Sequence, residues 1–273
     1  MLTILSAAAM AASLTTATCE NLASFYLENA TVVSAQAVPE GVFQSPPNTR
    51  PNQDTDSIPA HCRLTLELTP TSDSLINAEL WLPMDNWNGR FMAMGNGGWA
   101  GSIQGFREMQ PALRRGYATA GSDNGHSAAD GPGGMFALGH PEKIVDFAYR
   151  SIHDMTVKSK RLISEAYSQP VDYSYFKGCS TGGRQAMMAA QRYPGDFDGI
   201  IAGALANRHI YMHTAGSYRR LQLARNPEMA IPEDTAAMVN QALMAKCDVL
   251  KEGFLNDPRQ CNFNFATLQC PAG

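Results

Sequence analysis

Residues 173–203 decide the fold and read YSYFKGCSTGGRQAMMAAQRYPGDFDGIIAG. Segment 173–177 alternates and is rich in aromatic side chains, which predicts a strand, whereas the Gln/Ala/Met-rich segment 184–193 predicts a helix. Ser180 therefore lies at a strand-to-helix corner that fits G-x-S-x-G, where glycines allow a sharp turn and expose the hydroxyl. We predict that Ser180 is a nucleophile. The alternative is a tight turn whose serine only caps the helix.

A second glycine-rich stretch, G-N-G-G-W-A-G at 95–101, follows a predicted buried strand. It also fits the dinucleotide-binding pattern G-x-G-x-x-A, but the acidic residue expected about 20 residues later and a long following helix are missing. We favour a loop that lends a backbone N–H, from Gly97 or Gly98, to an oxyanion hole. The backbone N–H of Thr181 is the predicted second donor.

Strands and helices alternate around these two sites. Residues 19–59 are predicted to be loop-like. The predicted strands are 62–69, 75–82, 91–94, 117–120, 173–177 and 198–203, the last of them buried, and the predicted helices are 107–115, 142–166 and 184–193. Alternation of this kind requires a mostly parallel sheet with helices on both faces. The predicted class is α/β, with the N-terminal part of an α/β-hydrolase core at 19–208.

Residues 122–126 read S-D-N-G-H at the C-terminal end of a predicted strand. An Asp and a His three residues apart near a catalytic edge suggest an acid–base pair. An aspartate in a turn, however, usually accepts hydrogen bonds from local backbone N–H groups. We therefore predict a structural role for Asp123.

Composition excludes several classes of protein. The 273 residues carry 21 basic and 25 acidic side chains, a net charge of −4, and contain no basic run, which argues against nucleic-acid partners. No apolar stretch reaches the roughly 18 residues that a membrane span needs. Residues 1–18 resemble a signal peptide without a basic n-region, and a buried Ala-rich helix is the alternative. Six cysteines agree with an oxidising compartment, and the family resemblance described below implies a secreted or periplasmic protein.

The sequence pattern changes after residue 208, and residues 209–273 show no further strand of the sheet. They contain a predicted amphipathic helix at 232–250 and a cysteine-containing loop, and we predict the beginning of an inserted lid domain. A serine nucleophile needs a histidine base and an acid that orients it. The histidines after Ser180 are His209 and His213, and neither follows the additional strands that a hydrolase needs. We therefore expect the chain to be truncated before its triad is complete, and to be inactive alone.

Several stretches together resemble the tannase and feruloyl esterase family, which includes mono(2-hydroxyethyl) terephthalate hydrolase. They are N-W-N-G-R-F at 86–91, G-N-G-G at 95–98, G-H-P at 139–141, Y-F-K-G-C-S-T-G-G-R-Q at 175–185 and F-D-G-I-I-A-G-A at 197–204. The resemblance implies a serine esterase that acts on feruloyl, galloyl or terephthaloyl esters. Such an esterase needs no cofactor for its chemistry, and its partner is a small-molecule aromatic ester substrate. The rival hypothesis is a non-catalytic binding or structural domain that keeps the fold.

The resemblance also implies how the cysteines pair and where a metal could bind. It pairs Cys19 with Cys62 and Cys247 with Cys261, and it leaves the thiols of residues 179 and 270 free. Lid domains of this family often carry a calcium loop. The corresponding stretch here, C-D-V-L-K-E-G at 247–253, is three residues shorter and retains Asp248 and Glu252 as candidate ligands. The alternative is a solvated turn.

Overall fold

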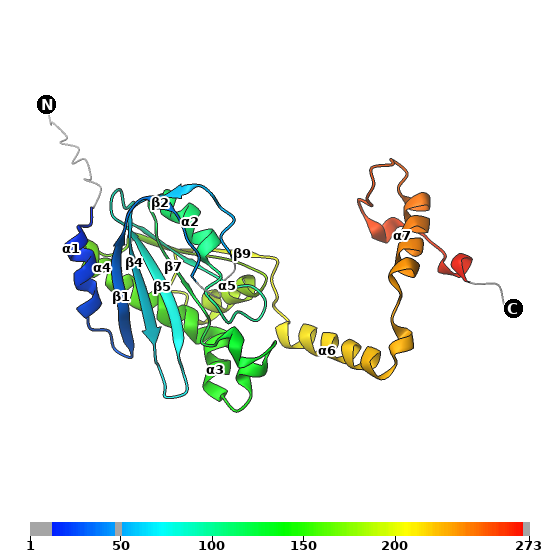
Figure 1. Cartoon of the computed structure of the whole chain (residues 1–273), viewed down its shortest axis with the longest axis horizontal. Coiled ribbons are helices and arrows are strands. Elements are labelled where there is room, and N and C mark those ends of the chain that lie inside the picture. The colour runs from blue at the N-terminus through cyan, green and yellow to red at the C-terminus, as the bar shows by residue number, and fades with distance from the viewer. Residues whose placement is uncertain (1–12, 47–50, 270–273) are drawn as a thin grey trace. The chain divides into compact units, whose positions relative to one another are not determined.

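The computed structural model describes residues 13–46 and 51–269. It divides into two compact units, Met1–Asn207 and Arg208–Gly273, which we describe separately (Figure 1). The division lies one residue from the predicted start of the lid at 209. No helix among the described residues is long and apolar enough to cross a membrane.

A seven-stranded sheet organises the first unit, in the order β1-β4-β5-β7-β6-β8-β9. Its strands are β1 (Ala30–Val38), β4 (His61–Leu68), β5 (Ile76–Pro83), β6 (Arg90–Met94), β7 (Ala118–Ser122), β8 (Tyr173–Cys179) and β9 (Gly199–Gly203). The four strands β7, β6, β8 and β9 are parallel, whereas β1, β4 and β5 join them through antiparallel pairs. The predicted α/β class is confirmed. A small separate sheet pairs β2 (Gly41–Val42) with β3 (Ser57–Ile58).

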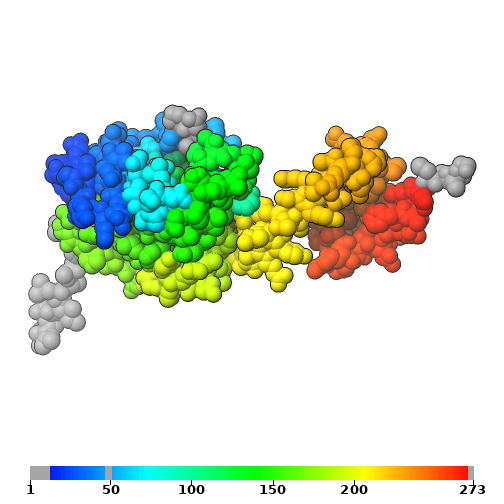
Figure 2. Space-filling model, turned by 90° about the horizontal axis from the view of Figure 1, so that it is seen from below, coloured from blue at the N-terminus to red at the C-terminus, as the bar shows by residue number. Residues whose placement is uncertain are grey.

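Helices cover both faces of this sheet (Figure 1). Those of the first unit are α1 (Thr16–Asn21), α2 (Phe106–Arg114), α3 (Pro141–Val145), α4 (Ser151–Tyr167) and α5 (Thr181–Arg192). Side chains of α1, α4 and α5 share one apolar cluster with alternate residues of the strands. Figure 2 shows the green to yellow-green surface of α4 and α5 along one side of this unit. Helix α2 packs against the residues that point to the opposite face.

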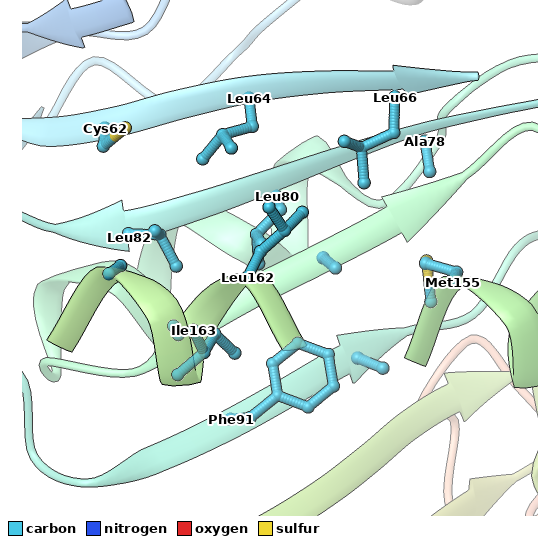
Figure 3. Close-up of a cluster of buried hydrophobic side chains, with 14 of the residues drawn as sticks. Cys62, Leu64, Leu66, Ala78, Leu80, Leu82, Phe91, Met155, Leu162 and Ile163 are labelled. Carbon is cyan, nitrogen blue, oxygen red and sulfur yellow. The ribbon is translucent and has the colours of Figure 1, made fainter. Parts of the chain in front are cut away.

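The larger cluster follows from the period-two alternation of strands. Figure 3 shows Leu64 and Leu66 of β4, Leu80 and Leu82 of β5 and Phe91 of β6 directed toward Leu162 and Ile163 of α4. The intervening residues face α2, where Trp81 stacks on Phe106 with ring centroids 5.8 Å apart. Each fully buried side chain of this size stabilises the fold by about 1.5–3 kcal/mol.

The prediction of a loop at 19–59 was wrong. The segment contains the end of α1 and the nine-residue strand β1, which pairs with β4 along its length. Leu14 is buried in the larger apolar cluster, and its N–H donates to the carbonyl of Met84 at 2.7 Å. Residues 13–18 of the predicted signal peptide therefore belong to the described structure, and the signal peptide itself stays a prediction. The remainder of the proposed signal peptide, residues 1–12, lies outside the described residues.

The predicted helix 142–166 is interrupted. A five-residue π-helix, Asp146–Arg150, separates α3 from α4. Because a π-turn inserts residues into the helical ladder, the apolar positions change phase between α3 and α4. The carbonyls of Phe147 and Ala148 in this segment accept hydrogen bonds from Arg184, as described below.

Strand β9 was predicted to be buried, which is also wrong. It lies at the edge of the sheet, pairs with β8, and its residues are half-buried or exposed, with Ile201 60% exposed. In the second unit, α6 (His209–Arg225) and α7 (Glu233–Cys247) are the main helices. None of the described side chains of α7 is buried, so an amphipathic burial pattern is not realised there.

Candidate active site

Ser180 connects β8 to α5 in an unusual backbone conformation, with φ 59° and ψ −117°. Non-glycine residues rarely adopt this region, and such strain is characteristic of functional turns. The glycines on either side allow the turn, since a Cβ on Gly178 would lie 2.4 Å from the backbone of Gly182. The side chain of Ser180 is exposed, and within the described residues its hydroxyl makes no hydrogen bond. This strand-to-helix corner, which we call the elbow, therefore has the sharp turn and the exposed hydroxyl that the sequence predicted.

The first turn of α5 provides the first candidate oxyanion donor. The N–H of Thr181 has no intrahelical acceptor, because it precedes the first complete turn, and it makes no hydrogen bond among the described residues. Its side chain is buried, and its Oγ1 donates to the carbonyl of Gly98 at 2.5 Å. The side chain of Thr181 thus attaches the glycine-rich loop at 95–101, called the glycine loop below, to the start of α5, while the Thr181 backbone N–H stays free.

The glycine loop follows β6 and contacts the elbow through backbone atoms. The N–H of Gly182 donates to the carbonyl of Asn96 at 2.7 Å. A Cβ on Gly95 would lie 2.7 Å from Cα of Gly182, so only glycine permits this approach. The buried amide of Gln185 accepts from the N–H of Asn96 at 3.0 Å and donates to Asn96 Oδ1 at 3.1 Å. Two elements distant in sequence are thereby fixed against each other.

The two loop glycines left open by the sequence differ in the structure. The N–H of Gly97 donates to Gln104 Oε1 at 2.9 Å. The N–H of Gly98 donates to no acceptor among the described residues, and Gly98 is exposed, with φ 56°. A Cβ on Gly98 would meet nothing within 4 Å, so open space lies beside it. The sequence assigned no role to Gln104 or Gln185: Gln104 lies in no recognised pattern, and Gln185 ends the family-like stretch 175–185 without a predicted contact.

Trp99 of the glycine loop packs in an aromatic cluster with Phe147 of the π-helix. Trp99 stacks on Phe147 with ring centroids 5.6 Å apart, and the Arg184 guanidinium lies 4.6 Å above the Phe147 ring. Arg184 Nη1 and Nη2 donate to the carbonyls of Ala148 and Phe147, both at 2.9 Å. Burial lowers the pKa of Arg184 to about 10. The π-helix, the nucleophile helix and the glycine loop therefore form one packed support.

The structural role predicted for Asp123 is confirmed. Its carboxylate accepts from the backbone N–H of Asn77, from Asn77 Nδ2 and from the N–H of Gly125. His126 is buried, and its ring stacks on Phe136 with centroids 3.7 Å apart. Burial lowers the pKa of His126, which favours the neutral ring. This pair holds the end of β7 and is not an acid–base pair.

No histidine in the described part of the first unit bonds Ser180. His153 Nδ1 contacts Asp196 Oδ2 at 2.8 Å, but Asp196 precedes β9, at the opposite end of the strands from the elbow. His140 Nδ1 contacts Asp73 Oδ1 at 2.7 Å in a surface pair. His209 and His213 belong to the second unit, where their ring centroids are 4.3 Å apart. The described part of the first unit thus places the candidate nucleophile and the candidate oxyanion donors together, and none of its described histidines bonds Ser180.

Both expected disulfides are present, joining Cys19 to Cys62 and Cys247 to Cys261. Cys179, beside the nucleophile, is a free and exposed thiol among the described residues. Residue 270 lies outside the described residues, so its predicted free state stays a prediction.

The candidate calcium ligands Asp248 and Glu252 accept hydrogen bonds within their own turn, and calcium binding stays untested. The two carboxylate oxygens of Asp248 accept from the backbone N–H groups of Glu252 and Gly253 at 2.9 and 2.8 Å. Glu252 Oε2 accepts from Asn256 Nδ2 at 3.0 Å. Among residues 13–46 and 51–269 there is no group of three or more His, Cys, Asp or Glu side chains that could hold a metal ion. Calcium would have to displace these N–H donors to gain oxygen ligands.

Comparison with known proteins gives a consistent result. The family model described as tannase and feruloyl esterase matches residues 62–273. An uncharacterized esterase of Xanthomonas campestris pv. campestris is 40% identical over 272 residues, covering 96% of this chain and 46% of the relative. Feruloyl esterase B of Aspergillus niger is 38% identical over 205 residues, covering 73% of this chain and 38% of the relative.

Solved structures agree with the sequence relatives. The crystal structure of feruloyl esterase B from Aspergillus oryzae superposes with a TM-score of 0.81 at 37% identity, covering 94% of this chain and 51% of that chain. The tannin acyl hydrolase of Aspergillus niger, at 21% identity and a TM-score of 0.63, shares the fold. The chain spans about half the length of the curated relatives that it matches. On the family model and the identity of these relatives, the chain belongs to the tannase and feruloyl esterase family.

Proposed function

We propose that this chain carries the nucleophile and the oxyanion hole of a serine carboxylic ester hydrolase. Its substrates are small-molecule esters of aromatic acids of the feruloyl, galloyl or terephthaloyl type. The main support is the strained, exposed Ser180 beside two backbone N–H groups, those of Thr181 and Gly98, that have no acceptor among the described residues. An oxyanion hole requires unpaired donors of this kind, fixed before the substrate arrives.

The proposed reaction proceeds through an acyl-enzyme. Ser180 Oγ attacks the ester carbonyl while a base takes its proton, and the N–H groups stabilise the negative carbonyl oxygen. The C–O bond to the alcohol then breaks, and the alcohol leaves with the proton that the base returns. Water, activated by the same base, attacks the acyl group and releases the aromatic acid together with free Ser180.

The base and its acid are proposed to come from outside the first unit, because its described histidines are engaged elsewhere. The chain covers about half of its relatives, and we infer that the matching remainder of such enzymes supplies both groups. We therefore expect residues 19–273 alone to lack turnover. In the full-length protein, we expect His209→Ala and His213→Ala to retain activity, since both precede the strands that should carry the base.

The test is hydrolysis of methyl ferulate, methyl gallate and a terephthalate monoester by the full-length protein. Ser180→Ala should abolish turnover, because loss of the serine nucleophile costs a serine hydrolase such as subtilisin roughly 10⁶-fold in kcat. Ser72→Ala, an exposed serine in the turn after β4, is the matched control and should retain full activity. A fluorophosphonate should label Ser180 and fail to label the Ser180→Ala variant.

A second candidate function is a non-catalytic aromatic-ligand domain, favoured by the absence of a base in the described part of the first unit. It predicts that ferulate binds while Ser180 stays unlabelled and no ester is cleaved. Unchanged hydrolysis in the Ser180→Ala variant would refute the esterase proposal itself.

We further propose a secreted or periplasmic location. Two disulfides support it, because such bonds persist in oxidising compartments. No cofactor is proposed for the chemistry, since nucleophile and oxyanion donors are protein groups. The signal peptide stays a prediction, and N-terminal sequencing of the mature protein would test it.

A further inference from the structure

We propose that Gln104 is a positioning residue of the oxyanion hole. By engaging the N–H of Gly97, its side-chain amide leaves the N–H of Gly98 as the donor that the glycine loop presents to the substrate. This inference rests on the proposed esterase function and deepens it, because it assigns the loop donor and names the side chain that selects it.

The Gln104 side chain closes the loop from one side. Its Oε1 accepts from the N–H of Gly97 at 2.9 Å, and its Nε2 donates to the carbonyl of Ala100 at 3.4 Å. The two bonds together fix the orientation of the amide, since Gly97 offers a donor and Ala100 an acceptor. One side chain therefore fixes both ends of the turn 97–100.

The direction of the Gly98 N–H follows from the neighbouring peptide groups. The N–H of Ala100 donates to the carbonyl of Gly97 at 3.0 Å, so this carbonyl points into the turn. In a trans peptide the C=O and the next N–H point in opposite directions, and the structure contains no cis peptide bond among its described residues. The N–H of Gly98 therefore points away from the turn that Gln104 closes.

The next peptide group brings this donor to the nucleophile helix. The carbonyl of Gly98 accepts from Thr181 Oγ1 at 2.5 Å, which places Gly98 beside the first turn of α5. The free N–H groups of Gly98 and Thr181 thus belong to residues in direct contact. Gly98 has φ 56°, a conformation that costs other L-residues roughly 1–2 kcal/mol. Glycine is therefore required here by the backbone and not by crowding.

An N–H that is already bonded is a poor oxyanion donor, because the developing charge would first have to displace its acceptor. In the absence of Gln104, the N–H of Gly97 becomes free and the turn keeps only its backbone bond from Ala100 to Gly97. The Gly98 N–H then has to be oriented during the reaction. This defect weakens an interaction made mainly in the transition state, so it lowers kcat and leaves KM nearly unchanged.

The experiment compares Gln104→Leu with Gln104→Glu in the full-length protein. Leucine removes both polar atoms, whereas glutamate keeps an oxygen that can accept from Gly97. Removal of one oxyanion donor costs about 10²–10³-fold in kcat; we expect loss of the positioning residue to cost about 10–10²-fold. KM should change by less than about 3-fold, and glutamate should restore kcat to within about 5-fold of wild type. Gln191→Leu, an exposed glutamine on α5, should be silent.

Two further readouts separate positioning from general loosening. An arylboronic acid, which forms a tetrahedral adduct with a serine, should lose affinity in parallel with kcat, whereas the product acid should bind as before. Amide exchange by NMR should show a protected Gly97 N–H and an unprotected Gly98 N–H in the wild type. In Gln104→Leu, the protection of Gly97 should be lost.

Wild-type kcat in Gln104→Leu would overturn the inference. So would a loss confined to KM, failure of glutamate to restore kcat, or a wild-type Gly97 N–H that exchanges freely. These outcomes are distinct from a failure of the proposed function, which would appear as turnover that survives Ser180→Ala. In that case the amide exchange still decides whether Gln104 holds the loop.

Discussion

Replacement of Gln185 by methionine is expected to destabilise the first unit by about 2–6 kcal/mol. The side chain is buried and makes two hydrogen bonds to Asn96, at 3.0 and 3.1 Å. Methionine has a similar length but satisfies neither the N–H nor the Oδ1 of Asn96. Each buried group left without a partner costs about 1–3 kcal/mol, and two such groups give the stated range. This is a large part of the 5–15 kcal/mol that typically holds a domain together.

Equilibrium urea unfolding followed by tryptophan fluorescence measures this loss. The three tryptophans, Trp81, Trp87 and Trp99, all lie in the first unit, so the signal reports that unit alone. The midpoint should fall with an unchanged m-value. Gln191→Met, an exposed position on the same helix, is the control and should change stability by less than about 0.5 kcal/mol. A loss below about 1 kcal/mol in Gln185→Met would refute the claim that this amide fixes the loop to the elbow.

The remaining predictions concern three other sites. Gly183→Ala places a Cβ 2.3 Å from the carbonyl oxygen of Gly203 and should lower the free energy of unfolding in urea by about 1–3 kcal/mol. Gly195→Ala is the control, because a Cβ there meets nothing within 4 Å and should cause no such loss. Equal losses in the two variants would contradict this prediction. Burial lowers the pKa of His61 to about 4. Because the unfolded chain binds this proton near pH 6.5, the free energy of unfolding should fall by up to about 3 kcal/mol as the pH drops from about 6.5 to 4. The variant His61→Gln should show a smaller dependence of stability on pH. An NMR titration midpoint near 6.5 for His61 would oppose it. Millimolar calcium or EDTA should leave the melting temperature unchanged. The variant Asp248→Ala should lower it, because two backbone N–H groups lose their acceptor. A melting temperature that rises with calcium would contradict this expectation and support a calcium site in the turn.

The sequence predicted those parts of the fold whose signals are local. The corner at Ser180 depends on neighbouring glycines, and the strands before and after it have clear residue preferences, so both were predicted correctly. Strand β1 was missed because its pairing with β4, about 30 residues away, stabilises a segment of mixed composition. The predicted burial of β9 failed for a similar reason, since burial depends on a neighbour strand and not on the apolar character of Ile200 and Ile201.

The candidate site shows the same division. The sequence narrowed the predicted loop donor to Gly97 or Gly98, and we propose that the choice depends on Gln104, whose contact with Gly97 has no sequence pattern. The π-helix was also missed, because apolar residues occur on both sides of it and the change of phase between them was not recognised. One of its carbonyls, that of Ala148, accepts from Arg184, which lies 36 residues later. Long-range polar contacts of this kind are specified by the folded backbone and not by neighbouring residues.

The first unit assembles its part of the site almost entirely from backbone atoms. The proposed donors are the N–H groups of Thr181 and Gly98, and glycines let the two chain segments approach each other closely there. Such a site needs side chains only to hold the backbone, which Thr181 Oγ1, Gln104 and Gln185 do. A base has to accept and return a proton, which a backbone amide does poorly, so we propose that the base is a side chain from outside the first unit. On the proposed function, oxyanion stabilisation and nucleophile geometry would be local properties of this unit, whereas activation of the nucleophile would depend on that additional side chain.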